Sequence, residues 1–363
     1  MALTDIDGGR LADNAFSLGK NLIINGAMQV AQRGTQVTGV STSGYRTVDR
    51  FKINFTSLGT WTIDQATDAP AGFTKSFKAT CTTADASPAA SDSALMVYQP
   101  EAQDLQLLDF GASGAKSITL SFWVKSNKTG AATIAVLQTD NSSKLVSFAY
   151  SISSANTWEQ KTITIPGDTA GVINDDNGAG LQFEWWLNSG SDNTAGSHRA
   201  TWTTFAQGDR NPSNLGVGGA TSDYFAITGV QLEVGSVATP FEHRRYGDEL
   251  ARCQRYAFVA RQDSDQTGFM NGAMWTGGTF IGVVHYPVTM RAKPDVTIAA
   301  VSDLTIFANG GSEAANTFLE QNASLVATEI SISLSAGHTG GESAWARLAS
   351  GGSSSKIVFD AEL

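Results

Sequence analysis

The chain of 363 residues carries 34 acidic against 24 basic side chains, a net charge of −10 at pH 7. This balance argues against a nucleic-acid partner and against an anionic membrane surface, because both favour a basic face. The sequence has no run of about 20 apolar residues that would span a membrane. The length predicts two or three domains.

The composition is typical of a β-protein with a polar, weakly charged surface. Charged residues make up only 16% of the chain, and 37 glycines against 8 prolines fit many tight turns between short strands. Cys81 and Cys253 have no metal or redox spacing, so we expect two buried free thiols. Charged residues from Asp5 to Asp13 interrupt any signal-peptide core, and we therefore expect folding in the cytoplasm of the producing cell.

Residues 1–20 are expected to form an arm rather than a domain. They contain a Gly-Gly pair, scattered charges and few large apolar side chains. A segment of this kind buries little surface alone, so it becomes ordered only when it docks on a partner.

Residues 21–243 show the period-two pattern of half-buried strands. The clearest segments are residues 118–124, 133–138, 161–166, 181–187 and 224–234. Strands at this spacing without intervening helices predict an all-β fold, a jelly-roll β-sandwich. An opening strand over residues 22–30 is expected to close the sandwich by pairing with residues 227–234.

A short linking helix is predicted over residues 244–258. Tyr246, Leu250 and Cys253 fall on one face of this helix. A helix of about 10–12 residues is marginal alone, so it must pack on something. Residues 259–363 predict a smaller C-terminal β-domain, for trimerisation or distal binding. Its expected strands are residues 280–285, 295–300, 304–308, 325–334 and 356–363.

The most distinctive segments are residues 21–35 (NLIINGAMQVAQRGT) and residues 227–258 (ITGVQLEVGSVATPFEHRRYGDELARCQRYAF). Together with a weaker echo in the C-terminal FDAEL, they resemble a module of tailed-bacteriophage virion proteins, mostly tail fibres and related appendages. The resemblance implies that residues 1–20 dock on the virion. It also implies that residues 21–243 are similar to carbohydrate-binding modules, and that the chain forms a homotrimer.

This resemblance implies a non-enzymatic bacteriophage structural protein, a trimeric tail fibre or receptor-binding appendage that contacts host-surface glycans. A head-decoration, head-fibre or connector protein with no receptor role is one alternative. A polysaccharide depolymerase is a second alternative. The expected partners are further copies of the chain, other virion proteins and host polysaccharide, without nucleic acid or membrane insertion. The expected location is the virion, after folding in the host cytoplasm.

Aromatic side chains are the candidate ligand-binding residues, because sugar rings stack on exposed Trp and Tyr. Trp123 faces away from the apolar side of its strand. Trp185 and Trp186 must point to opposite faces of theirs, so at least one leaves the main core. Trp202 completes the candidate set for glycan stacking. A ring beneath a loop or at a subunit contact is the alternative for each residue.

Loop oxygens supply a candidate site for a structural calcium ion. The jelly-roll modules that the chain resembles often hold Ca²⁺, and Asp175, Asp176 and Asn177 form an oxygen-rich cluster. Solvated loop charge is the alternative. A depolymerase would need paired carboxylates, and no motif in the sequence marks such a pair. We predict no catalytic residue and no required cofactor.

Overall fold

A computed structural model describes residues 19–140, 144–261, 268–309, 311–335, 337–348 and 356–363. Of the predicted arm, residues 1–18 lie outside the described residues. The chain forms two compact units. Unit 1 comprises Met1–Ala31 and Thr35–Tyr246, and unit 2 comprises Gln32–Gly34 and Gly247–Leu363.

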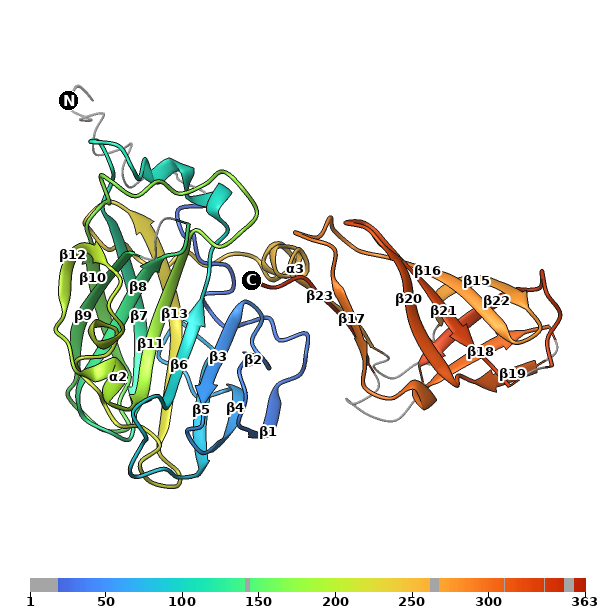
Figure 1. Cartoon of the computed structure of the whole chain (residues 1–363), viewed down its shortest axis with the longest axis horizontal. Coiled ribbons are helices and arrows are strands. Elements are labelled where there is room, and N and C mark those ends of the chain that lie inside the picture. The colour runs from blue at the N-terminus through green and yellow to red at the C-terminus, as the bar shows by residue number, and fades with distance from the viewer. Residues whose placement is uncertain (1–18, 141–143, 262–267, 310, 336, 349–355) are drawn as a thin grey trace, which may run out of the picture. The chain divides into compact units, whose positions relative to one another are not determined.

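Unit 1 is a sandwich of two antiparallel sheets (Figure 1). Sheet A has the strand order β1 (Gln36–Val40), β4 (Thr60–Ala66), β5 (Ser76–Thr83), β13 (Tyr224–Val234), β7 (Ile118–Ser126) and β10 (Glu159–Ile165). Sheet B has the order β12 (Arg199–Thr204), β9 (Lys144–Ile152), β8 (Gly130–Gln138), β11 (Leu181–Ser189), β6 (Ser93–Tyr98), β3 (Phe51–Thr56) and β2 (Gly44–Tyr45). Among the described residues of unit 1, three short helices lie in loops: η1 (Ala102–Leu108), α2 (Ser191–Thr194) and η2 (Gln207–Asp209). The predicted all-β sandwich is confirmed.

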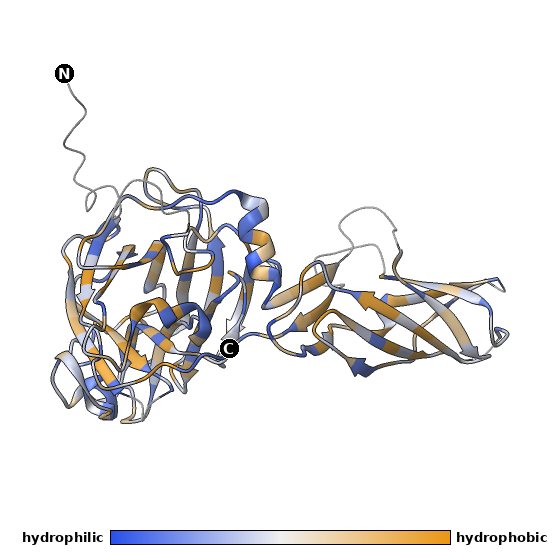
Figure 2. Cartoon of the chain, turned by 90° about the horizontal axis from the view of Figure 1, so that it is seen from above, coloured by the Kyte–Doolittle hydropathy of each residue, from blue (hydrophilic) through white to orange (hydrophobic). Residues whose placement is uncertain are grey.

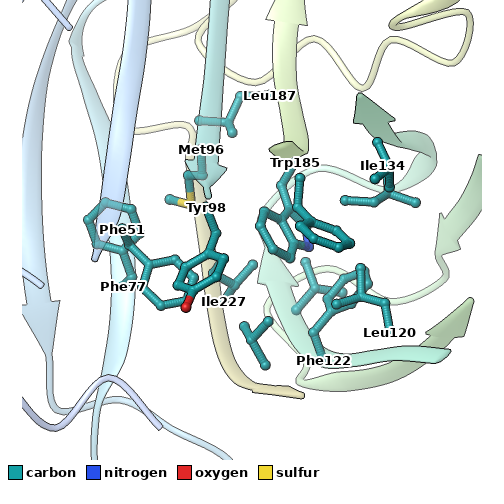
Figure 3. Close-up of a cluster of buried hydrophobic side chains, with 14 of the residues drawn as sticks. Phe51, Phe77, Met96, Tyr98, Leu120, Phe122, Ile134, Trp185, Leu187 and Ile227 are labelled. Carbon is teal, nitrogen blue, oxygen red and sulfur yellow. The ribbon is translucent and has the colours of Figure 1, made fainter. Parts of the chain in front are cut away.

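Aromatic rings from both sheets fill the space between them (Figure 3). The Trp185 ring on β11 meets the Phe122 ring of β7 edge-on, with 5.8 Å between centroids. Phe51 packs on Tyr98 at 5.1 Å. These side chains are at most 1% exposed, so the alternation seen in the sequence corresponds to a continuous core.

The predicted opening strand over residues 22–30 is wrong, because this segment is irregular. Asn25 and Met28 have φ of 61° and 58°, a left-handed conformation that a strand cannot contain. The segment still lies along β13: Leu22 N–H donates to the Leu232 carbonyl at 2.9 Å. Val230 N–H donates to the carbonyl of residue 26, also at 2.9 Å. The contact was predicted correctly, and the extended conformation was not.

The end of unit 1 fastens this irregular segment. The Glu242 carboxylate accepts the Asn21 N–H at 2.8 Å. The Arg244 guanidinium donates to the carbonyls of Asn21 and Ile23. The Asn21 side chain in turn accepts the Leu232 N–H of β13 at 3.0 Å. The two distinctive sequence segments therefore meet in unit 1, and their polar residues satisfy backbone groups there.

Unit 2 contains helix α3 (Tyr246–Gln254), which is shorter than the predicted 244–258, and two antiparallel sheets. The smaller sheet is β14 (Ala257–Arg261), β23 (Lys356–Asp360) and β17 (Asp295–Ile298). The larger is β19 (Gly311–Ala314), β18 (Leu304–Ala308), β22 (Ser343–Leu348), β15 (Gly268–Thr276), β16 (Thr279–His285), β21 (Ala327–Ser333) and β20 (Thr317–Ala323). The short helix η3 (Val301–Asp303) precedes β18. Both apolar and polar residues occur along these strands (Figure 2). Buried and accessible positions alternate in β21, β22 and β23, and the buried side chains form a second core.

A three-residue segment from early in the chain belongs to unit 2. The Arg33 side chain is 6% exposed and pairs with Asp360 at 2.9 Å and Glu362 at 3.4 Å. The Gln32 amide donates to the Ala257 carbonyl at 2.7 Å. These ion pairs connect the sequence AQRGT with the C-terminal FDAEL.

The two cysteines and the absence of an apolar membrane span were also predicted from the sequence. Cys81 and Cys253 are both buried thiols. Among the residues that the structure describes, no helix is long and apolar enough to cross a membrane.

Candidate functional site

Two of the predicted sugar-stacking residues are inaccessible. Trp185 is 0% exposed in the main core, and Trp186 is 1% exposed in a small cluster on the opposite face of sheet B. One ring of the pair does leave the main core, as expected, but it stays covered. The Arg210 guanidinium lies 4.9 Å from the Trp186 ring centre, and Phe205 packs on the same cluster. Neither ring has a free face for a sugar, so both are structural residues.

Trp202 on β12 also has a packing role. Its ring meets Phe110 edge-on at 5.8 Å, and its indole N–H donates to the Pro166 carbonyl at 2.7 Å. The residue is half-buried against the main core. It lies at the edge of sheet B, whereas Trp123 lies on sheet A, so these two candidates do not form one site.

The outer face of sheet A gathers aromatic and polar side chains that remain accessible. Trp123 on β7, Trp158 just before β10 and Tyr224 on β13 are all partly exposed. We define the aromatic platform as these three rings together with Asp68, Lys78, Lys125 and Asn156. Sequence reasoning identified only Trp123 of this set. The outward parity of Tyr224 on its predicted strand was a usable signal, and Trp158 had none because it precedes its strand.

Strand register explains why these residues meet. Ala226 on β13 lies opposite Lys78 of β5 on one side and opposite Lys125 of β7 on the other. Two residues further along β13, Thr228 lies opposite Trp123 of β7. Alternate residues of a strand share a face, so both rows point outward from the core.

Hydrogen bonds and charges hold the platform together. Asp68 accepts the Lys125 ammonium at 2.8 Å and the Trp158 indole N–H at 3.2 Å. Burial opposes ionisation of Asp68, but these hydrogen bonds and the charges of Lys125 and Lys78 outweigh it, so its pKa lies below the usual value. The Lys78 ammonium lies 4.4 Å from the centre of the Tyr224 ring. The Trp158 ring is held at its polar edge by the hydrogen bond to Asp68, and the Lys125 ammonium lies over the ring, 5.9 Å from its centre. The residue stays partly exposed, so part of the ring remains accessible.

Tyr224 closes the other side of the platform. Its hydroxyl donates to the Asn156 side-chain oxygen at 2.7 Å. Partial burial raises the pKa of Tyr224, so the phenol stays protonated at neutral pH. The platform thus presents a neutral phenol, two indoles, two ammonium groups, one carboxylate and one amide along adjacent strands.

A β-bulge extends the aromatic surface. Pairing of β13 with β7 shifts between Thr228 and Gln231, and Gly229 has φ of 59°. A Cβ atom at this position would lie 2.6 Å from the Phe73 ring and 2.9 Å from the Trp123 ring. Only glycine therefore lets both rings close over β13. Phe73 continues the surface through Phe241, 4.9 Å away between ring centroids.

The calcium candidates lie in an exposed loop. Asp175, Asp176 and Asn177 are all exposed, and Asp176 accepts the N–H of residue 178 at 2.8 Å. Burial and the nearby Asp176 charge raise the pKa of Asp140. Within the described ranges, no group of three or more His, Cys, Asp and Glu side chains is arranged to hold a metal ion. Calcium binding by these three residues stays a prediction.

Three acidic side chains of unit 1 already have partners. Glu184 is 0% exposed and pairs with Arg210 under the covered part of sheet B. Glu101 is also fully buried, and it accepts the Gln103 amide. Glu159 pairs with Lys161 at 2.7 Å. A separate pocket of about 250 Å³ lies between η1 and residues 172–173, and its lining mixes apolar side chains with Gln106 and Asp109.

The sequence matches no protein-family model and no curated protein. Similar solved structures include the enzymatically active domain of bacteriophage CBA120 tailspike protein 4, with 13% identity over 59% of this chain and a TM-score of 0.31. That match spans 21% of the tailspike chain. A putative sugar-binding protein of Bacteroides thetaiotaomicron shows 13% identity over 59% of this chain and 99% of its own, with a TM-score of 0.32. The family 11 carbohydrate-binding module of a Clostridium thermocellum cellulase shows 12% identity over 60% and 96%, with a TM-score of 0.28. At these scores, functional inference rests on the residues of the chain itself.

Proposed function

We propose that the chain is a non-enzymatic bacteriophage virion protein that binds glycans through the aromatic platform of unit 1. In its specific form, the proposal is a homotrimeric tail fibre or receptor-binding appendage that contacts host-surface polysaccharide. The platform carries the glycan-binding part of this proposal. The resemblance of residues 21–35 and 227–258 to virion appendage proteins supports the remainder.

The platform complements both kinds of sugar surface. A sugar ring has an apolar C–H face and a rim of hydroxyl groups. Indole and phenol rings match the first, while Asp68, Asn156 and the lysines can exchange hydrogen bonds with the second. The residues extend over β5, β13, β7 and the start of β10, three strand spacings or about 14 Å. An open face of this length suits a chain-like ligand better than a single small molecule.

The same geometry favours binding without hydrolysis. Glycosidases use two carboxyl groups on opposite sides of the scissile bond, one of them an acid with a raised pKa. Asp68 has a lowered pKa and is occupied by Lys125 and Trp158. It therefore cannot supply a proton near neutral pH, and it is suited to accepting hydrogen bonds.

In this proposal, residues 1–20 dock on the virion after folding in the host cytoplasm. A trimer presents three platforms, so weak sites would combine into high avidity. As an alternative, the chain could be a head-decoration, head-fibre or connector protein without a receptor role, and the platform would then contact another virion protein. A depolymerase is the second alternative, and release of soluble sugar from a polysaccharide would reveal it.

Replacement of the accessible tryptophans tests the proposal. We expect Trp123→Ala and Trp158→Ala each to weaken binding of the full chain to a retained polysaccharide roughly 10-fold to 100-fold, as removal of an aromatic anchor does. Trp275→Ala is the matched control, because Trp275 is 74% exposed on β15 in unit 2. Binding can be measured by calorimetry after a screen of immobilised bacterial surface polysaccharides.

Several outcomes distinguish the alternatives. Equal effects of all three substitutions would contradict a site on the platform. A chain that retains no polysaccharide, and whose solution mass is 38.2 kDa rather than three times that value, would favour the decoration-protein alternative. Light scattering at micromolar concentration supplies the mass.

A further inference from the structure

The cation arrangement on the platform carries information about the ligand. Lys125 is neutralised by Asp68, with 2.8 Å between ammonium and carboxylate. Lys78 makes no ion pair among the described residues, and its ammonium instead lies over the Tyr224 ring. Asp64 stands opposite Lys78 in the strand register, but it accepts the Gln36 amide at 2.8 Å. The Lys78 ammonium is thus turned toward the platform, and its charge acts on Asp68.

Most other cations of unit 1 are already matched by acids. The pairs are Lys20–Glu233, Lys116–Asp109, Lys128–Asp223, Lys144–Asp168, Lys161–Glu159, Arg199–Asp209 and Arg210–Glu184. Lys78 differs from these residues in having no acidic partner among the described residues, and its ammonium rests on the partly exposed Tyr224 ring beside two further accessible rings. An ammonium held over a ring retains two or three N–H donors for an incoming anion.

We propose that the platform selects acidic glycans, with the carboxylate of a uronic or sialic acid bound by Lys78 and the sugar ring stacked on Tyr224 or Trp158. This inference rests on the proposed glycan-binding function and specifies its ligand class. The Asp68 carboxylate does not oppose such a ligand, because Lys125 and the Trp158 indole N–H already compensate it. The remaining positive charge on the platform belongs to Lys78.

Because the whole chain is acidic, selectivity for an acidic glycan must arise from contacts at the platform. With a net charge of −10, most of the surface repels an acidic polymer. Attraction must therefore come from short-range contacts at the platform, and it should weaken as salt screens the single ion pair. A general basic surface would instead bind every polyanion, including nucleic acid.

The test compares acidic polysaccharides with uncharged forms of the same chains. The probes are polygalacturonate, alginate, hyaluronan and polysialic acid, each beside its carboxyl-reduced or esterified counterpart, with a sulfated galactan as a different anion. For at least one pair, we expect the full chain to bind the acidic form roughly fivefold to twentyfold more tightly at low salt. Lys78→Met should remove this preference, and Lys78→Arg should retain most of it.

Lys52→Met is the matched control, because Lys52 lies over Tyr45, 5.8 Å from the ring centre, on sheet B. It should leave the preference unchanged. Equal binding of acidic and neutral forms, or equal effects of Lys78→Met and Lys52→Met, would overturn the inference while leaving glycan binding intact. Stronger binding of the sulfated galactan than of every carboxylated chain would overturn the assignment to a carboxylate. Failure of every probe to bind, acidic or neutral, would overturn the proposed function as well.

Discussion

Gly229 offers a sharp test of how the platform is built. Substitution by alanine at this bulge forces a side chain into a backbone with φ of 59°. A non-glycine residue in this conformation costs about 1–2 kcal/mol. The new methyl group would also lie 2.6 Å from the Phe73 ring and 2.9 Å from the Trp123 ring. Displacing packed side chains costs about 1–3 kcal/mol more, so we expect Gly229→Ala to lower the free energy of unfolding by about 2–5 kcal/mol.

Gly216→Ala separates the two contributions. Gly216 has φ of 71°, yet a Cβ atom there would meet nothing within 4 Å. It should therefore show the backbone cost alone. Urea unfolding followed by tryptophan fluorescence measures both variants, and a loss of about 2–5 kcal/mol moves the midpoint by about 1–2.5 M for a slope of about 2 kcal/mol per M. If Gly229→Ala is no more destabilising than Gly216→Ala, the argument that Phe73 and Trp123 close over the bulge is wrong.

Two further predictions concern charge. Arg33→Gln should destabilise unit 2 by about 2–4 kcal/mol, because it removes a buried cation from the 3% exposed Glu362; hydrogen exchange along β23 would show the loss, and unchanged protection would contradict it. Acid should weaken unit 1: burial alone would raise the pKa values of Asp168, Asp209 and Asp223, but hydrogen bonds and nearby cations lower them. Their unfolded forms bind protons first, so the stability that they supply is complete above about pH 4 and is lost as pH falls through the lower folded pKa values. Unfolding free energies that stay flat from pH 5 to pH 3 would refute this account.

Period-two hydropathy predicted most of the sandwich because it depends only on which side of a strand meets the core. β13 matches the predicted residues 224–234, β8 and β11 contain their predicted segments, and β10 covers the predicted 161–166 except Pro166. The segment over residues 22–30 failed because its conformation depends on distant partners. Asn25, whose φ is positive, bonds the carbonyls of Val30 and Asp49. Apolar composition alone gave no sign of these contacts.

The candidate site was less predictable because exposure of a ring is decided by what covers it. Trp186 alternates correctly to the outside of β11, yet Arg210 and Phe205, some twenty residues later, cover that face. Trp158 is held in the site by a hydrogen bond to Asp68, which lies 90 residues away in the sequence. Local patterns therefore located the sheet faces, and only the fold distinguished the open face from the covered one.

The most direct test of the central claim is a titration of the chain, with ¹⁵N-labelled tryptophan, followed by NMR of its eight indole N–H groups. Substitution assigns each signal, and a short oligosaccharide from a retained polysaccharide serves as the ligand. We predict saturable shifts for Trp123 and Trp158, with the signals of the buried Trp185 and Trp186 and of the exposed Trp275 unchanged. Shifts confined to Trp275, or binding that leaves both platform indoles unmoved, would contradict a glycan site on the outer face of sheet A.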